Sequence, residues 1–179
     1  MVETKELYKD VTNEWISKTT KVRIVFDDFF IDDKGNYHPN TEHEKIRIPK
    51  RDNEEYKIAK ILSKELNTTI HIVPTFTNIK NTQGGTRTPD YIINGQKWDL
   101  KTPKYKSEYL NLFNDILRKK QLKKQSNRFI INLINYPQID ENKIKKICNR
   151  LFYNKYMFWI LGLIIIKDNH IYKVYIKQK

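Results

Sequence analysis

The part of the chain best suited to chemistry is a short hairpin that carries two aspartates and a lysine. Asn94-Gly95 is the strongest short-range signal for a two-residue hairpin turn. If these residues form the turn, Asp90 lies directly opposite Asp99, and both carboxylates project from the same face as Lys101. The apolar residues of the two strands then project from the other face: Tyr91, Ile93, Trp98 and Leu100.

Two opposed carboxylates repel each other, so something must offset the repulsion. A divalent cation, a protonated carboxyl or the ammonium of Lys101 could do so. A Mg²⁺ ion bound by two carboxylates, with a lysine two residues along, suits phosphodiester hydrolysis. The metal polarises the phosphate and acidifies a water, while the lysine orients that water or stabilises developing negative charge. The alternative, an exposed hairpin edge with ordinary surface charges, leaves the pairing of the two acids unexplained.

The elements around this hairpin are expected in the order α-β-β-β-α-β. Asp52 or Asn53 can cap the first helix, which the apolar spacing predicts to run to about Leu66. The expected elements that follow are a strand over 68–76, the two hairpin strands over 88–102, a helix over 109–124, a strand over 128–134, a helix over 140–152 and a strand pair over 159–176 that turns at Asp168-Asn169. Helices flanking a mixed sheet predict an α/β (α+β) domain.

The N-terminal part of the chain is less regular. Residues 5–17 predict a short helix of weak periodicity, residues 21–31 predict a strand, and residues 33–36 predict a turn. Residues 37–52 are polar and punctuated by proline, which is typical of a boundary. The sequence therefore predicts an N-terminal appendage over 1–44, either an import or docking segment or a fold extension, and a main domain over 45–179.

The charge of the 179-residue chain is strongly positive and uneven. Its 34 basic and 21 acidic side chains give a net charge of +13, and residues 101–155 alone hold 14 basic against four acidic side chains. Solubilised helix faces could explain the excess, and a phosphate-binding surface is the sharper interpretation. Cys148 alone cannot make a disulfide framework, and nothing in the sequence indicates a small-molecule cofactor. The longest apolar run, 157–166, is about half a membrane span, so no stable membrane association is expected.

The hairpin also resembles a known nuclease motif. Pro89-Asp90 followed by Asp99-Leu100-Lys101 resembles the PD-(D/E)xK motif, whose core has the same α-β-β-β-α-β order. Residues 45–170 look like the C-terminal toxin nuclease domains of contact-dependent growth inhibition (CdiA-type) proteins and related polymorphic toxins. The stretches that carry this resemblance are EYKIAKILSKEL, TTIHIVPTF, GGTRTPDYIINGQKWDLKT and LRKKQLKKQSNRFIINL.

The resemblance implies particular site residues. An acidic residue of the first helix, the PD aspartate, the acid and lysine of the third motif, and a Lys-Gln pair before the next strand recur in the family. Here these fall on Glu55, Asp90, Asp99, Lys101 and Lys124-Gln125. Glu54 competes with Glu55 for the first position. The family usually has glutamate where this chain has Asp99. The shorter aspartate side chain places the carboxylate one methylene closer to the backbone.

These assignments predict one metal site and one substrate surface. Asp90, Asp99 and Glu55 are expected to bind Mg²⁺ or another divalent cation. The expected substrate contacts are Thr102, Arg87, Lys120, Lys124 and Gln125. Each has a structural alternative, since lysines suit a helix C-terminus and threonines are ordinary in strands.

Other residue groups favour structural roles. His71 alternates with apolar strand residues and is predicted to be structural. The acids among residues 27–33 predict a solvated turn, because they lack the ligand spacing of a calcium loop. The aromatic residues of 152–158 could stack on bases, but core packing is the favoured interpretation.

The resemblance implies a toxin nuclease that hydrolyses RNA, above all a tRNA endonuclease. Such a domain is delivered into the cytoplasm of a target bacterium in interbacterial competition and is blocked by a cognate immunity protein, expected here to be acidic. A DNase of the same fold remains an alternative, because metal chemistry on a phosphodiester does not distinguish the sugars. A non-catalytic nucleic-acid-binding module is the third hypothesis.

Overall fold

A computed structural model describes residues 7–27, 29–31, 37–39, 46–47, 53–76, 88–104 and 126–178 of the chain. The predicted helix over 109–124 and the predicted turn over 33–36 lie outside these residues. No helix in the described ranges is long and apolar enough to cross a membrane.

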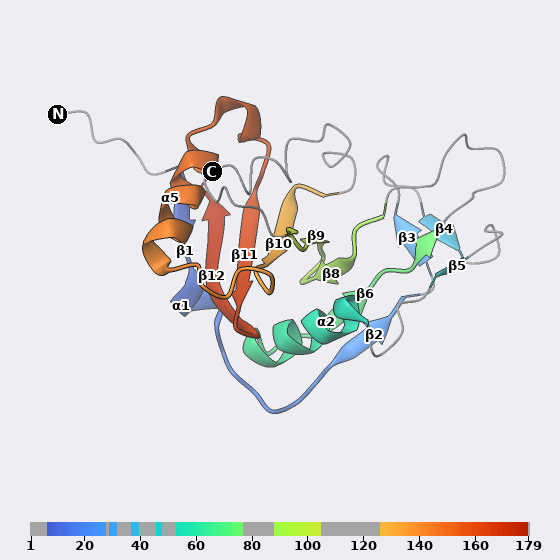
Figure 1. The fold of residues 1–179 in the computed structure, drawn as a ribbon. Coiled ribbons are helices and arrows are strands. Elements are labelled where there is room, and N and C mark those ends of the chain that lie inside the picture. Colours follow the sequence, from blue (N-terminus) through green and yellow to red (C-terminus); the bar gives the residue numbers. More distant parts are fainter. Residues whose placement is uncertain are drawn as a thin grey trace.

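The described strands form a mixed sheet of eight strands in the order β1-β12-β11-β10-β9-β8-β6-β2 (Figure 1). Its strands are β1 (Tyr8–Asp10), β2 (Ile24–Phe26), β6 (Ile70–Ile72), β8 (Tyr91–Ile93), β9 (Gln96–Lys101), β10 (Arg128–Asn132), β11 (Gly162–Lys167) and β12 (His170–Lys177). Strands β9, β10 and β11 are mutually parallel, as are β2 and β6, and the other neighbours are antiparallel. Two small antiparallel pairs join β3 (Phe29–Ile31) to β4 (Tyr37–Pro39) and β5 (Ile46–Arg47) to β7 (Thr75–Phe76).

The predicted hairpin is confirmed, including its register. Tyr91 pairs with Trp98, and Asn94 and Gly95 form the turn with φ angles of 49° and 72°. Two central residues with positive φ match the twist of the strands that they join. The ladder begins at Tyr91, so Asp90 stands just before β8, where its carbonyl accepts a hydrogen bond from the Val73 amide at 3.0 Å.

The two long helices also match the sequence. Helix α2 (Glu54–Glu65) follows Asn53, whose side chain caps it by accepting a hydrogen bond from the Tyr56 amide. Helix α5 (Glu141–Phe152) is capped by Asp140 in the same way, through the Lys143 amide. Each cap satisfies a backbone donor that has no partner within the helix.

The predicted helix over 5–17 is wrong. This segment forms β1 and only a four-residue helix, α1 (Thr12–Trp15), because β1 pairs with β12 and becomes the edge strand of the sheet. Tyr8 is buried, stacks on Phe152 with ring centroids 4.0 Å apart, and its hydroxyl donates a hydrogen bond to the Ile160 carbonyl. Both β1 and β2 therefore belong to the main sheet although they lie within the first 44 residues.

The sheet has a hydrophobic core on each face. One core lies under α5 and contains Phe129, and the other lies under α2 and contains Tyr91 and Trp98. Asp99 pairs with Phe129 in the parallel ladder between β9 and β10. Because paired residues share a face, the Asp99 side chain projects from the face that α5 covers.

The observed fold is mixed α/β, as predicted. The described elements from residue 53 onward run α2, β6, β8, β9 and then β10, with the short β7 of the separate pair between β6 and β8. The helix expected between β9 and β10 lies outside the described residues, so the complete PD-(D/E)xK core stays a prediction.

Candidate active site

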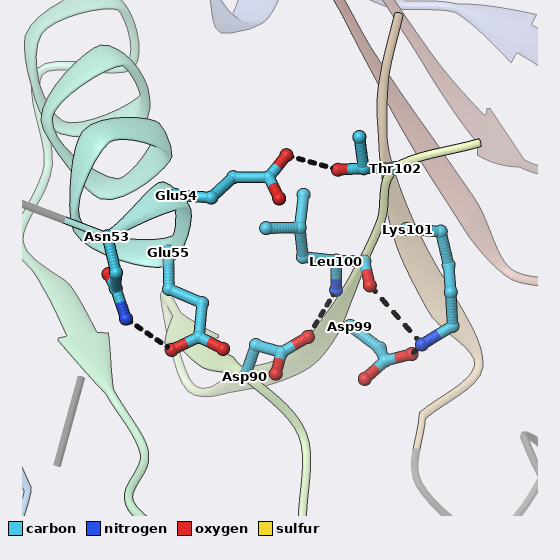
Figure 2. A pocket seen from close by; sticks show the side chains of 8 residues that line it. All are labelled: Asn53, Glu54, Glu55, Asp90, Asp99, Leu100, Lys101 and Thr102. Atoms are coloured by element: carbon cyan, nitrogen blue, oxygen red, sulfur yellow. Dashed lines mark hydrogen bonds and ion pairs between the residues drawn. The ribbon is translucent and has the colours of Figure 1, made fainter. Parts of the chain in front are cut away.

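A polar pocket of about 330 Å³ lies between the first turn of α2 and the hairpin (Figure 2). It is lined by Asn53, Glu54, Glu55, Asp90, Asp99, Leu100, Lys101 and Thr102. The structure therefore gathers four predicted catalytic residues and one predicted substrate contact into a single pocket. Arg87, Lys120, Lys124 and Gln125 lie outside the described residues.

Asp99 is the most deeply buried acid of the pocket, with 1% of its surface exposed. Its Oδ2 forms an ion pair with the Lys101 ammonium, but neither carboxylate oxygen accepts a hydrogen bond from any described residue. Burying a carboxylate without hydrogen bonds is costly, and nearly all buried polar groups have partners. Apart from its ion pair with Lys101, the Asp99 carboxylate thus has unused capacity to bind a cation.

Asp90 lies beside it and is held by the backbone. Its Oδ2 accepts a hydrogen bond from the Leu100 amide at 2.6 Å. Burial raises the pKa of Asp90 well above its ordinary value, and the negative charge of Asp99 raises it further. The hydrogen bond from Leu100 and the charge of Lys101 oppose that shift without cancelling it. The pair therefore favours a bound cation or a shared proton over two bare charges.

Lys101 places a positive charge against this pair. Its ammonium contacts Asp99 and donates a hydrogen bond to the Leu100 carbonyl at 3.2 Å. The Lys101 side chain is 22% exposed, so most of it is buried and a small part is open to solvent. The predicted placement of Lys101 on the same face as Asp99 is confirmed.

The geometry separates the two competing glutamates. Glu55 points toward Asp90 (Figure 2), and the Asn53 side-chain amide donates to its Oε2 at 3.3 Å. The Tyr91 hydroxyl also donates to the Glu55 backbone carbonyl at 2.8 Å, which fixes the first turn of α2 against the hairpin. Glu54 instead turns away from the two aspartates, so Glu55 is the better candidate for the acid of the first helix.

Glu54 forms hydrogen bonds with Thr102 and Asn132, a contact that we call the clamp and that the sequence did not indicate. Its carboxylate accepts hydrogen bonds from the Thr102 hydroxyl and from the Asn132 side-chain amide, the latter at 2.7 Å. Asn132 is buried at the end of β10, and its own amide oxygen accepts from the Ile134 amide. The clamp ties α2 to the ends of β9 and β10. A polar residue ending the apolar run Phe129-Ile130-Ile131 was the one signal that could have revealed it.

The donors present suit a metal ion held by two carboxylates. Among the described residues, no three His, Cys, Asp or Glu side chains form a group that could hold one. Asp90 and Asp99 form a pair, and Mg²⁺ commonly binds one or two carboxylates and keeps several waters. The Asp99 carboxylate, whose partner among the described residues is the Lys101 ammonium, fits that role. Glu55 as a third ligand stays a prediction.

Two of the described histidines, His71 and His170, contact acidic side chains. His71 Nδ1 lies 2.8 Å from the buried Asp27 carboxylate, and His170 Nδ1 lies 2.5 Å from Glu65. His71 is therefore structural, as the sequence predicted. Asp27 is buried beside it and does not stand in a solvated turn, which corrects that expectation for this one acid.

The fold and the pocket together define a mixed α/β domain with a buried acidic pair beside a lysine. Residues 87–171 match the family model of the contact-dependent growth inhibition CdiA C-terminal domain. The matched segment is similar to a CdiA C-terminal toxin domain, and it includes Asp90, Asp99 and Lys101 but not α2 with Glu55. No curated protein and no solved structure matches the chain.

The family assigns a biological role to the domain. A CdiA C-terminal domain is a delivered toxin module of contact-dependent growth inhibition, and toxin domains of this kind pair with immunity proteins.

Proposed function

We propose that this toxin domain is a metal-dependent endonuclease that hydrolyses RNA phosphodiester bonds, with tRNA as its substrate. The observation that supports the proposal best is the close Asp90–Asp99 pair, in which the buried Asp99 carboxylate has the Lys101 ammonium as its ion-pair partner and no other donor among the described residues. Such a pair is costly to a fold unless a ligand uses it.

Asp90 and Asp99 are the residues that would hold the metal ion. A bound Mg²⁺ supplies positive charge to the scissile phosphate and makes a bound water more acidic. The Leu100 amide fixes the orientation of the Asp90 carboxylate. Because Asp99 lies in β9 and Asp90 is held just before β8 by the Val73 and Leu100 amides, little rearrangement is needed when the ion binds.

Lys101 would act on the reacting phosphate. Its ammonium can orient the attacking water or stabilise the negative charge that develops on phosphate oxygens. Its ion pair with Asp99 keeps the ammonium at the edge of the acidic pair. Glu55, which points toward Asp90, would extend the acidic wall of the pocket toward α2.

The strongly basic region over 101–155 would hold the nucleic acid. Phosphate contacts from lysine and arginine position a nucleic acid without reading its sequence. The proposed contacts are Thr102, Arg87, Lys120, Lys124 and Gln125. Thr102 binds Glu54 in this structure, so contact with substrate would require its hydroxyl to be shared with or released from the clamp.

The partner and the place of action follow from the family role. We propose that an acidic immunity protein covers the basic surface in the producing cell, because complementary charge speeds association. The toxin would act in the cytoplasm of the target bacterium, where tRNA is abundant. No small-molecule cofactor takes part in the proposal.

A substrate panel tests the proposed activity. The protein is incubated with total tRNA, duplex DNA and single-stranded DNA, with Mg²⁺ or with EDTA. We expect cleavage of tRNA alone, and only with Mg²⁺. Cleavage of DNA alone would contradict the RNA assignment and favour the DNase alternative, and binding without cleavage would favour the non-catalytic module.

The metal site has a test that needs no substrate. We expect Mg²⁺ or Mn²⁺ to raise the melting temperature, because a ligand at a hundred times its Kd stabilises the folded state by about 2.7 kcal/mol. Differential scanning fluorimetry across a metal titration measures the shift. The Asp99→Asn variant should lose it, and Asp168→Asn, which changes an exposed acid, should keep it. Equal shifts in both variants would show that the ion binds elsewhere.

A further inference from the structure

Three exposed aromatic side chains lie close together beyond the end of α5. Tyr153, Tyr156 and Phe158 are 77%, 66% and 43% exposed, and they lie in and around the short helix η2 (Lys155–Met157). The sequence interpretation as core packing is wrong for these three residues and right for Phe152, which is buried. Contiguous exposed apolar surface is typical of binding sites, whereas single exposed apolar side chains are ordinary.

Basic residues surround these rings. The Lys155 ammonium lies 5.2 Å from the Tyr156 ring centroid, and the Lys177 ammonium lies 5.7 Å from that of Phe158. Arg150 is exposed in the last turn of α5, three residues before Tyr153, which follows the helix and keeps a helical backbone, so the two lie on the same side. The sequence has no acidic residue between Glu141 and Asp168. We call Arg150, Tyr153, Lys155, Tyr156, Phe158 and Lys177 the aromatic-basic ridge.

The backbone presents the rings rigidly. Met157 and Ile160 are buried on either side of Phe158 and anchor the segment to the core. The Asn154 side chain accepts a hydrogen bond from the Tyr156 amide, and the Lys177 ammonium donates to the Phe158 carbonyl at 2.5 Å. Because the segment is already ordered, the rings would lose little conformational freedom on binding.

The ridge and the acidic pocket lie beside different strands. Arg128, at the start of β10, pairs with Gly162, which follows the ridge at the start of β11. On the other side of β10, Asp99 of β9 pairs with Phe129, and the pocket extends along the strands to Glu54, which contacts Asn132. Strand β10 lies between β11 and β9. The ridge is therefore separate from the pocket, and one ligand must extend past β10 to reach both.

We infer that the aromatic-basic ridge binds unpaired bases of the RNA substrate by stacking, as a second contact away from the pocket. This inference rests on the proposed nuclease function and adds a substrate requirement to it. Stacking on tyrosine tolerates any base, and neighbouring lysine and arginine attract the phosphates between bases. The lack of acidic residues in the ridge favours a polyanion over a protein surface of mixed charge.

Binding in EDTA tests the ridge without cleavage. Fluorescence anisotropy compares a labelled single-stranded 12-nucleotide RNA with its duplex, using the wild type, Tyr153→Ala/Tyr156→Ala and Tyr153→Phe/Tyr156→Phe. We expect the alanine variant to bind the single strand about 10-fold or more weakly, because stacking contributes strongly for each base. The phenylalanine variant, which keeps both rings, should stay within about twofold of the wild type. Val25→Ala, a change at an exposed residue of β2, is the matched surface control.

The outcomes separate this inference from the proposed function. If the alanine variant binds the single strand with wild-type affinity, the inference that the ridge binds RNA is overturned. This holds also where the surface serves a protein partner instead. An equal loss for the duplex, or an equal loss in the phenylalanine variant, would overturn stacking. If the protein binds single strands through the ridge yet cleaves no nucleic acid with Mg²⁺, the inference stands and the proposed function fails. Melting curves in each case confirm that the exposed substitutions leave the fold intact.

Discussion

The Asp99→Asn variant is expected to cleave RNA about 10³-fold more slowly than the wild type, while melting at no lower temperature in EDTA. The rate falls because the amide cannot supply the charge that holds a cation at the scissile phosphate, and removing one charge-stabilising group from an active site commonly costs 10²- to 10³-fold. Stability is retained because the substitution removes a buried carboxylate and its repulsion of Asp90, which offsets the loss of the ion pair with Lys101, whose side chain is 22% exposed and stays in reach of water. Replacing a residue that serves folding rather than catalysis would lower the melting temperature and leave the cleavage rate of the folded protein largely unchanged.

The measurement is the single-turnover rate on tRNA with Mg²⁺, together with a thermal melt in EDTA. Asp168→Asn is the matched control, because Asp168 lies in an exposed turn with a φ angle of 51°, which asparagine tolerates. We expect this control to cleave at the wild-type rate. An Asp99→Asn protein that cuts tRNA at the wild-type rate would remove the acidic pair from the mechanism, whatever the substrate.

The hairpin could be predicted in detail because its determinants are local. Asn94 and Gly95 take up positive φ angles readily, and once the turn is fixed the alternation of the strands places each side chain on a face. The same holds for the starts of α2 and α5, where Asn53 and Asp140 cap the backbone within three residues of themselves. The pairing of Asp90, Asp99 and Lys101 in one pocket follows from these local rules.

Contacts between distant parts of the chain could not be predicted in this way. Strand β1 forms because Tyr8 finds the edge of β12 and a place against Phe152, more than 140 residues away. The contact between Glu54 and Asn132 joins residues 78 positions apart. Such pairings depend on the assembled sheet, and tertiary contacts override weak local periodicity. The exposure of Tyr153 and Tyr156 is likewise a property of the surface, since their sequence spacing also suits a core.

The Asp90→Asn variant is expected to be more stable than the wild type at pH 7 in EDTA. Burial and the charge of Asp99 raise the pKa of Asp90 well above its ordinary value of 3.8. As the pH rises above that ordinary value, the unfolded chain releases this proton while the folded chain still holds it. The unfolded state then binds fewer protons than the folded state, so the stability of the wild type falls with rising pH until the raised pKa is passed. Asparagine does not titrate in this range, so the stability of the Asp90→Asn variant does not decline for this reason.

The stability difference between the two proteins should therefore depend on pH in a defined direction. It should be small below the ordinary pKa, grow as the pH rises, and level off above the raised pKa. At pH 7 we expect at least about 1 kcal/mol, or a melting temperature about 2–4 °C higher for a chain of this size. Thermal melts from pH 4 to pH 8 measure the difference, and Asp168→Asn should show no such pH-dependent gain. If the variant is less stable than the wild type throughout this range, the Asp90 carboxylate and its hydrogen bond from Leu100 stabilise the fold. The presence of the acidic pair would then need no bound ligand to explain it.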